Sequence, residues 1–230
     1  MRNAPDAVML FAAGFGTRMG ALTANCPKPM IPVAGKPLID HALDQITDFG
    51  MGTIVANLHY KPEQIISHLA RSDILFSDES DEILETGGGL RAALPLLGSR
   101  PVFTMNTDAV WKGPNPLDLL AKGWNPEKMD ALLLCIPLAN AVNHTGKGDF
   151  LIDPSGRASR GPGLVYSGLQ ILKTDGLHAI PERAFSLNLL WNKMRENQRL
   201  FAIAYTGHWA DVGSPEGITA AESMLDQDHV

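Results

Sequence analysis

The sequence predicts an α/β fold in which a mainly parallel sheet is covered by helices on both faces, in three layers, with a small antiparallel insertion. Continuous apolar runs of strand length alternate along the chain with segments whose apolar residues recur at helical spacing. Such continuous runs are typical of parallel strands that are buried on both faces. Residues 137–167 differ, because glycines there separate short apolar pieces, which indicates antiparallel strands.

The first elements in order are a strand, a glycine-rich turn, a proline-rich loop, a helix and a second strand. Residues 8–11 are the first apolar run, and the glycine-rich turn follows it directly. From Leu38 the apolar residues recur at helical spacing until Gly50, a residue type that commonly ends helices. Residues 53–56 then predict the next strand. Two strands joined through a helix favour parallel pairing.

The same alternation continues to the end of the chain. Pro62 suits the first turn of a helix, and the turn sequence of residues 153–156 predicts a hairpin after a strand at 150–152. The other expected elements are helices over 62–69, 90–97 and 187–194 and after residue 215, and strands at 74–76, 101–105, 131–136 and 201–205. No repeat or linker divides the chain, so we expect one domain over residues 1–230.

The composition excludes several classes of protein. A charged fraction of 19% is too low for a disordered or coiled-coil chain, and the net charge of -6 argues against a general nucleic-acid binder. The apolar run of residues 8–13 is far shorter than the roughly 20 residues of a membrane span, and no basic segment with a cleavage site precedes it. Two cysteines in 230 residues are typical of reduced thiols. We therefore expect a soluble cytoplasmic protein without nucleic-acid or membrane partners.

The glycine-rich turn is a candidate phosphate-binding loop. Gly14 and Gly16 let the backbone bend sharply and bring its N–H groups close to a phosphate. The lysine and hydroxyl residue that end a P-loop are missing. A dinucleotide fingerprint fits poorly, since the third glycine comes one place late at Gly20. A plain tight turn is the remaining interpretation, and it leaves Arg18 without a role.

The following loop is stiffened by prolines. Residues 27–37 contain four of them, and Lys28 stands between two, where the backbone has few options. A stiff loop can hold a lysine with little ordering cost on binding. Lys36 in the same loop is interpreted as an ordinary solvated charge.

These motifs together resemble the opening signature of sugar-1-phosphate nucleotidyltransferases. The resemblance rests first on residues 10–19 and 27–37. Further segments similar to that family are residues 57–65, 85–89 and 208–213, and the strand that leads to Asp108. The resemblance implies a Rossmann-like three-layer α/β/α sandwich, the nucleotide-diphospho-sugar transferase fold. It also implies that about residues 1–110 bind the nucleotide and about residues 111–230 bind the sugar phosphate.

The resemblance implies a reaction and a set of site residues. The family transfers a nucleotidyl group from a nucleoside triphosphate to a sugar 1-phosphate with Mg²⁺, so charge neutralisation and positioning supply most of the rate. Arg18 and Lys28 would be the catalytic cations, and Asp108 and Asp211, each expected after an apolar strand, the metal ligands. The implied nucleotide-binding residues are Ala12, Ala13, Gly14, Gly16, Thr17, Arg18, Lys28, Thr86 and Gly87, and the implied sugar-binding residues are Asp149, Ser167 and Gly168. Taken alone, Thr86 is also a candidate N-cap of a helix.

Within the family, four segments resemble the uridylyltransferases that act on N-acetylmuramic acid α-1-phosphate, an activity of peptidoglycan recycling. These segments are residues 84–89, 93–98, 146–150 and 207–213. Asn188 stands where guanylyltransferase relatives tend to have Glu, and Thr107 where the family usually has Gly.

Several alternatives stay open. The chain could be a mannose-1-phosphate guanylyltransferase or another hexose-1-phosphate nucleotidyltransferase, or it could act on a different phosphorylated alcohol such as choline phosphate. A non-catalytic regulator that binds a sugar nucleotide is the alternative from another class. We expect small-molecule substrates and a monomer or small homo-oligomer.

Overall fold

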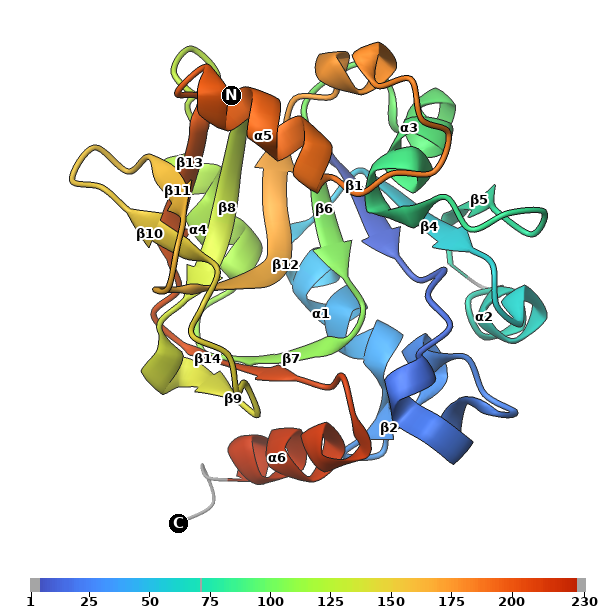
Figure 1. The fold of residues 1–230 in the computed structure, drawn as a ribbon. Helices are drawn as coiled ribbons and strands as arrows, with labels where there is room; N and C mark the ends of the chain where they lie inside the picture. The colour runs from blue at the N-terminus through green and yellow to red at the C-terminus, as the bar shows by residue number, and fades with distance from the viewer. Residues whose placement is uncertain (1–4, 71, 227–230) are drawn as a thin grey trace.

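The computed structural model describes residues 5–70 and 72–226, and its centre is a seven-stranded sheet (Figure 1). The strands follow the order β13-β8-β12-β6-β1-β4-β5, and β12 alone runs antiparallel to its neighbours. Their bounds are β1 Ala7–Phe11, β4 Thr53–Leu58, β5 Leu75–Asp78, β6 Val102–Asn106, β8 Ala131–Ile136, β12 Val165–Leu172 and β13 Leu200–Ala204. The sheet is therefore mixed and mainly parallel, as predicted.

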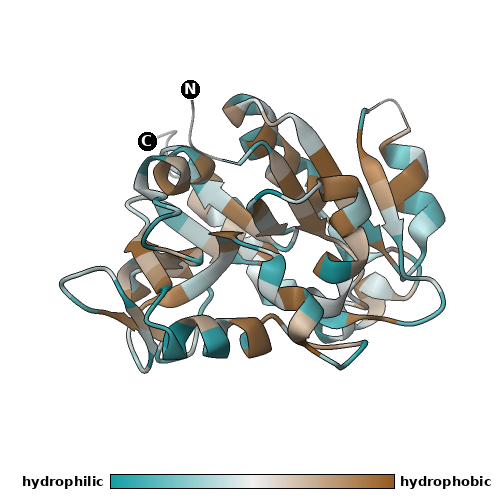
Figure 2. Cartoon of the chain, turned by 90° about the horizontal axis from the view of Figure 1, so that it is seen from above, coloured by the Kyte–Doolittle hydropathy of each residue, from teal (hydrophilic) through white to brown (hydrophobic). Residues whose placement is uncertain are grey.

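Helices cover both faces of this sheet. Helices α1 (Leu38–Phe49), α2 (Pro62–His68) and α4 (Pro116–Gly123) share one apolar core with one face of the strands. Helices α3 (Glu85–Leu97) and α5 (Asn188–Glu196) share a second core with the other face. Figure 2 shows the brown, hydrophobic strands between helices that carry teal residues on part of their surface. The predicted three-layer α/β/α sandwich is confirmed.

Smaller elements surround the sandwich. A sheet of three short strands has the order β7-β14-β9 and packs with helix α6 (Pro215–Asp226) around a third apolar cluster. The remaining elements are β2 Pro32–Val33, β3 Lys36–Pro37, β7 Ala109–Lys112, β9 Ala141–Val142, β10 Phe150–Ile152, β11 Ala158–Arg160 and β14 His208–Asp211, with short 3-10 helices η1 Thr17–Thr23, η2 Lys28–Met30, η3 Leu138–Asn140 and η4 Asp175–Ala179. None of the helices in the described part of the chain is long and apolar enough to cross a bilayer.

The elements with local sequence signals lie close to where they were expected. Gly50 ends α1 with a left-handed backbone (φ 77°), and its N–H donates to the carbonyls of Ile46 and Thr47. The predicted hairpin is present, with β10 and β11 paired antiparallel across the turn at residues 153–156. The Asp153 carboxylate accepts hydrogen bonds from the backbone N–H groups of Ser155 and Arg157, which fixes this turn.

Helix α3 differs from the prediction, which began it at residue 90. It begins at Glu85 and includes three consecutive glycines, residues that disfavour helix interiors. Close packing explains them, because a Cβ at Gly87 would lie 2.3 Å from the Phe185 ring and one at Gly88 would lie 2.5 Å from the Arg183 carbonyl. Glycine lets the segment before α5 press against the first turns of α3.

Helix α4 and the β7-β14-β9 sheet were not expected from the sequence. Helix α4 is capped by Asn115, whose side-chain Oδ1 accepts from the Leu117 N–H at 2.9 Å, and Pro116 occupies its first turn. Strand β14 pairs antiparallel with β7, about 100 residues earlier in the chain, with Asp211 opposite Ala109. Pairing over such a distance leaves no local sequence signal.

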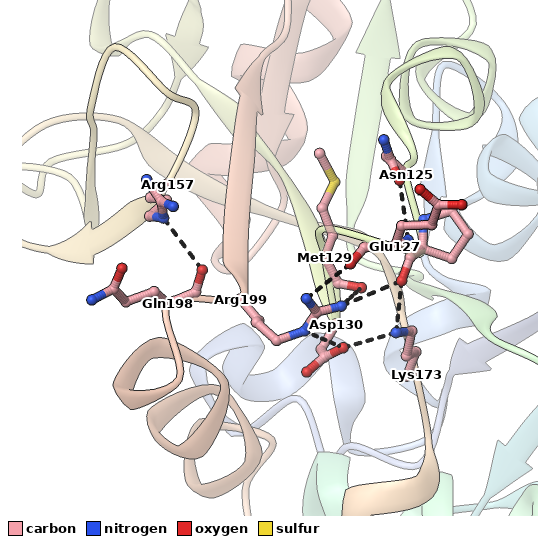
Figure 3. A network of polar contacts seen from close by, with 9 residues as sticks. Asn125, Glu127, Met129, Asp130, Arg157, Lys173, Gln198 and Arg199 are labelled. Atoms are coloured by element: carbon pink, nitrogen blue, oxygen red, sulfur yellow. Dashed lines mark hydrogen bonds and ion pairs between the residues drawn. The ribbon is translucent and has the colours of Figure 1, made fainter.

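The sandwich is tied together at the ends of β8, β12 and β13 by an ion-pair network (Figure 3). Asp130 accepts from both Lys173 Nζ and Arg199 Nε at 2.9 Å, and Arg199 also donates to the carbonyls of Glu127 and Met129. Burial works to raise the pKa of Asp130, but the hydrogen bonds from Lys173 and Arg199 hold it below its usual range. This network lies at the start of β8, while the cleft described next lies beyond the carboxyl ends of the parallel strands.

Candidate active site

A cleft with two chambers lies at the carboxyl ends of β1, β4 and β6. The first chamber has a volume of about 210 Å³ and the second of about 290 Å³, and Phe11, Thr86 and Asn106 line both. The first chamber is also lined by Ala13, Gly14, Lys28, Pro29, Asn57, Glu79, Ile83, Glu85, Thr107 and Asp108. The second is also lined by Asp149, Arg160, Tyr166, Ser186, Leu187, Asn188 and Trp191. Open α/β sheets typically bind ligands at this edge.

The glycine-rich loop forms one wall of the first chamber. It leaves β1 at Ala12, whose buried N–H donates to Asn57 Oδ1 at 2.8 Å. Gly16 has a φ of 64°, and a Cβ there would lie 2.8 Å from the Cβ of Lys28. Glycine is therefore needed at this position both for the backbone angle and for the contact with Lys28. Thr23 holds the loop from the other side, since its hydroxyl donates to the Gly16 carbonyl at 3.2 Å.

Lys28 is a buried cation placed at the chamber wall. It begins the short helix η2 between two prolines, and only 11% of its side chain is exposed. Its Nζ lies 2.7 Å from Asp108 Oδ2. A buried lysine paired with one carboxylate oxygen keeps hydrogen-bonding capacity for an anionic ligand in the cleft. Lys36, by contrast, is exposed and pairs with Asp44 at the surface, as an ordinary solvated charge would.

The two aspartates expected to bind metal lie on different kinds of element. Asp108 follows β6, but Asp211 does not follow a strand of the main sheet. It is the last residue of β14, and the pairing of β14 with β7 brings it beside Asp108, where the Val212 N–H donates to the Asp108 carbonyl at 2.9 Å. Buried Trp209 and Ala210 precede Asp211 as expected, but their strand belongs to the small β7-β14-β9 sheet and not to the parallel strands of the main sheet.

The electrostatics of this pair suit a cation. Burial, and next the charge of Asp108, raise the pKa of Asp211 above its usual range. Two carboxylates close enough for one charge to act on the other offer the kind of oxygen donors that Mg²⁺ prefers. In the described ranges no group of three or more His, Cys, Asp or Glu side chains could hold a metal.

Arg18 lies on the Asp211 side of the cleft and is exposed. Its guanidinium packs against Gly213, where a Cβ would lie only 2.9 Å from Nη1. The charge of Arg18 also acts on Asp211, where it opposes the rise in pKa. Gly16, Thr17 and Arg18 are not among the residues that line the two chambers.

The start of α3 borders both chambers, since Thr86 lines each of them. The Thr86 hydroxyl accepts from the Leu187 N–H at 3.0 Å, so it joins α3 to the segment before α5. The helix has Leu84 at its N-cap, which means that the N-cap interpretation of Thr86 was wrong. The Gly87 N–H already donates to the Phe185 carbonyl at 2.8 Å.

In the second chamber, Asp149 faces the cleft, while Ser167 and Gly168 lie behind it. Asp149 Oδ2 accepts from the Tyr166 N–H at 2.8 Å. Ser167 is buried, and its hydroxyl donates to the Leu134 carbonyl at 2.7 Å. Gly168 has a φ of 84°, and a Cβ there would lie 2.7 Å from the Asn106 side chain. The irregularity of β12 at these residues gives Asn106 room to reach both chambers.

A buried polar pair in the wall of the first chamber was not expected from the sequence. Asn57 Nδ2 donates to Glu79 Oε1 at 2.7 Å, and Glu79 Oε2 accepts from the Leu84 N–H at 3.0 Å. Only 3% of each of the two residues is exposed. The available signal was a polar residue near the carboxyl end of an apolar strand, which Asn57 is at the end of β4 and Glu79 just after β5.

Thr107 also acquires a role in the structure. Its hydroxyl donates to the Phe11 carbonyl at 2.9 Å, so it ties the end of β6 to the end of β1. The residue that departs from the usual family pattern therefore supports the floor of the first chamber.

Comparison with known proteins places this site in a family. Residues 8–140 match the MobA-like NTP transferase domain, so the chain belongs to that nucleotidyltransferase family. It is 37% identical to the N-acetylmuramate alpha-1-phosphate uridylyltransferase of Caulobacter vibrioides, over 98% of this chain and 99% of the relative. It is 32% identical to the protein of the same name from Neisseria meningitidis, over 94% and 96% of the two chains.

Relatives with another activity are more distant. Identity falls to 27% for the probable mannose-1-phosphate guanylyltransferase 2 of Arabidopsis thaliana, and the alignment covers 95% of this chain but 65% of that one. Among solved structures, HddC from Yersinia pseudotuberculosis superposes with a TM-score of 0.75 at 22% identity, over 94% of this chain and 98% of that one. At that identity the likeness supports the fold alone.

Proposed function

We propose that this protein transfers a uridylyl group from UTP to N-acetylmuramic acid α-1-phosphate, with Mg²⁺, and releases pyrophosphate. The observation that carries the reaction type is the buried Lys28 held against Asp108, with Asp211 beside them, at the edge of the sheet. The full-length similarity to two uridylyltransferases of that name supports the choice of acceptor and nucleotide.

The proposed reaction needs neutralisation of charge more than proton transfer. An oxygen of the sugar phosphate attacks the α-phosphorus of UTP, and the bond to the pyrophosphate oxygen breaks. The attacking oxygen is already anionic, so no general base is required. Both reactants are anions, and fixed cations stabilise the charge that they share in the transition state.

The chain's own cations then have separate roles. Lys28 would bind the α-phosphate and the attacking phosphate, because it is the buried lysine on the wall of the first chamber. Arg18, exposed on the Asp211 side, would bind the leaving pyrophosphate. Asp108 and Asp211 would hold Mg²⁺, which supplies further positive charge to the phosphate oxygens when it is bound.

Each chamber would receive one substrate. Ala13 and Gly14, which line the first chamber, would contact the nucleotide, and Gly16 and Thr17, outside its lining, would bind the triphosphate beside it. Ala12 would hold the loop in place through its bond to Asn57, and Thr86 and Gly87 would lie near the base. On the other side, Asp149 Oδ1 would accept hydrogen bonds from sugar hydroxyls, while Oδ2 stays bound to the Tyr166 N–H. Ser167 and Gly168 would contribute by shaping the chamber wall. We also propose that the protein acts in the cytoplasm, where UTP and sugar phosphates occur, as a monomer or small homo-oligomer.

A pyrophosphate-release assay with each nucleoside triphosphate against a panel of sugar 1-phosphates tests this function. We expect the highest kcat/KM for UTP with N-acetylmuramic acid α-1-phosphate, and no turnover when Mg²⁺ is chelated. Lys28→Met should lose turnover, while Lys36→Met, a change at an exposed ion pair of the same loop, should keep it. Turnover of GTP with mannose 1-phosphate alone would contradict the proposed substrates. Failure of every pair would favour a non-catalytic binding protein.

A further inference from the structure

The second chamber holds one cation whose charge the proposed reaction does not use. Arg160, the last residue of β11, lines this chamber together with Asp149 and Asn188. It is the one lysine or arginine among the described residues that line the second chamber, and none of the described carboxylates forms an ion pair with it. The Asp149 carboxylate is close enough for its charge to act on Arg160, but the two side chains form no ion pair. An arginine that faces a ligand cleft without a directly bonded carboxylate suits an anionic group on the ligand.

The guanidinium of Arg160 is held in a fixed plane. Its Cζ lies 4.4 Å from the centre of the Phe150 ring and 5.4 Å from that of Trp191. Phe150 faces Arg160 across the β10-β11 hairpin, and Tyr166 packs edge-on against Trp191 at 4.9 Å. Stacking on aromatic rings leaves the N–H groups at the guanidinium edge available, and it limits the freedom that the side chain would lose on binding.

A chain of hydrogen bonds fixes one of these N–H groups. Arg160 Nη2 donates to Asn188 Oδ1, and Asn188 Nδ2 donates to the Ser186 hydroxyl at 2.9 Å. All three residues line the second chamber. An asparagine at position 188 accepts from the guanidinium without neutralising it, whereas a glutamate there would supply a counter-ion.

We infer that Arg160 is a specificity residue that binds a carboxylate carried by the sugar of the acceptor, and that Asn188 positions it. The inference rests on the proposed function, because N-acetylmuramic acid differs from N-acetylglucosamine by a lactyl ether that ends in a carboxylate. A planar guanidinium can bind such a carboxylate through two parallel hydrogen bonds. The acceptor phosphate lies elsewhere in this account, at Lys28, so Arg160 discriminates between sugars without taking part in the transfer.

The test compares two acceptors that differ only in the lactyl group, N-acetylmuramic acid α-1-phosphate and N-acetylglucosamine α-1-phosphate, each with UTP and Mg²⁺. Arg160→Gln keeps a donor for Asn188 but removes the charge. We expect its kcat/KM to fall about 10- to 100-fold with the muramic acid substrate, mainly through KM, and to change less than about threefold with the other. Arg160→Lys should retain the charge but lose the paired hydrogen bonds, giving a smaller loss on the same acceptor.

Arg157→Gln is the matched control on the same hairpin. Arg157 also stacks on an aromatic ring, that of Phe201 at 5.7 Å, and its Nε donates to the Gln198 carbonyl (Figure 3). It does not line the second chamber, so both acceptors should keep their kcat/KM. Circular dichroism and the thermal midpoint of each variant show whether it is folded.

The outcomes separate this inference from the proposed function. If the wild-type protein fails to use the muramic acid substrate, the proposed function is wrong and the inference falls with it. If the wild type uses that substrate but Arg160→Gln loses the same factor with both acceptors, the proposed function stands and the role of Arg160 in selecting the carboxylate is refuted.

Discussion

Replacement of Asn57 by alanine should destabilise the protein strongly, because this side chain satisfies two buried partners. Its Oδ1 accepts from the Ala12 N–H, and its Nδ2 donates to Glu79. Leaving the buried Ala12 N–H unpaired costs about 1–3 kcal/mol, and removing a hydrogen bond from a carboxylate costs about 1.5–3 kcal/mol. The variant should therefore lose about 2.5–6 kcal/mol of unfolding free energy, out of the roughly 5–15 kcal/mol that is typical of a domain.

Urea unfolding followed by the fluorescence of the four tryptophans measures this loss. A second pair of variants tests the cause. Asn57→Asp keeps the acceptor for Ala12 but sets a carboxylate against Glu79, so it should also destabilise the fold. Combining it with Glu79→Gln restores a donor and an acceptor between the two side chains and should recover most of the stability. A loss below about 1 kcal/mol in Asn57→Ala, or no recovery in the double variant, would refute this account of the pair.

Three further predictions concern the cleft. Lys28→Met should lower kcat about 100- to 1000-fold in the pyrophosphate-release assay, as removal of a transition-state donor does, with Lys36→Met unchanged. Gly16→Ala should cost about 1–2 kcal/mol for its left-handed backbone and should also lower turnover, because its Cβ meets Lys28; full activity would contradict that contact. Asp211→Asn should abolish Mg²⁺-dependent turnover yet raise the thermal midpoint at neutral pH. The raised pKa of Asp211 means that its carboxyl group binds a proton more tightly in the folded state than in the unfolded state. The ionised carboxylate therefore destabilises the fold above that pKa, and this effect is absent below about pH 4. An unchanged thermal midpoint at neutral pH would argue against burial as the cause of the raised pKa.

The elements that the sequence predicted well are those with local causes. Residues 131–136 form β8 as expected, because an unbroken apolar run of that length is typical of a strand buried on both faces. Gly50 ends α1 by a backbone angle that glycine adopts readily, and residues 153–156 form their turn through the side chain of Asp153. Each signal lies within a few residues of the structure that it specifies.

The elements that the sequence did not predict depend on distant partners. The three glycines of α3 disfavour a helix locally, and only the contacts of Phe185 and Arg183 explain them. Strand β14 is positioned by its antiparallel pairing with β7, which lies about 100 residues earlier in the chain. Local propensity carries no information about either contact, because tertiary packing overrides it.

The residues of the candidate site fall into the same two groups, those with a local sequence signal and those that depend on distant partners. Lys28 between two prolines and Gly16 before it could be selected from the sequence, and the structure packs them together. Asn57 and Glu79 are 22 residues apart in the sequence, and their role becomes visible only in the structure, where they form a buried hydrogen bond. In the sequence nothing distinguishes Arg160 from the other arginines. In the structure it lies against the rings of Phe150 and Trp191 and lines the cleft.

The proposed substrates of this cleft are UTP and N-acetylmuramic acid α-1-phosphate. The decisive experiment is steady-state pyrophosphate release with that pair, measured beside GTP with mannose 1-phosphate under the same Mg²⁺ concentration. We expect turnover of the first pair that disappears in Lys28→Met and with chelator, and a much lower kcat/KM for the second. Turnover of the second pair without the first would contradict the proposed substrates.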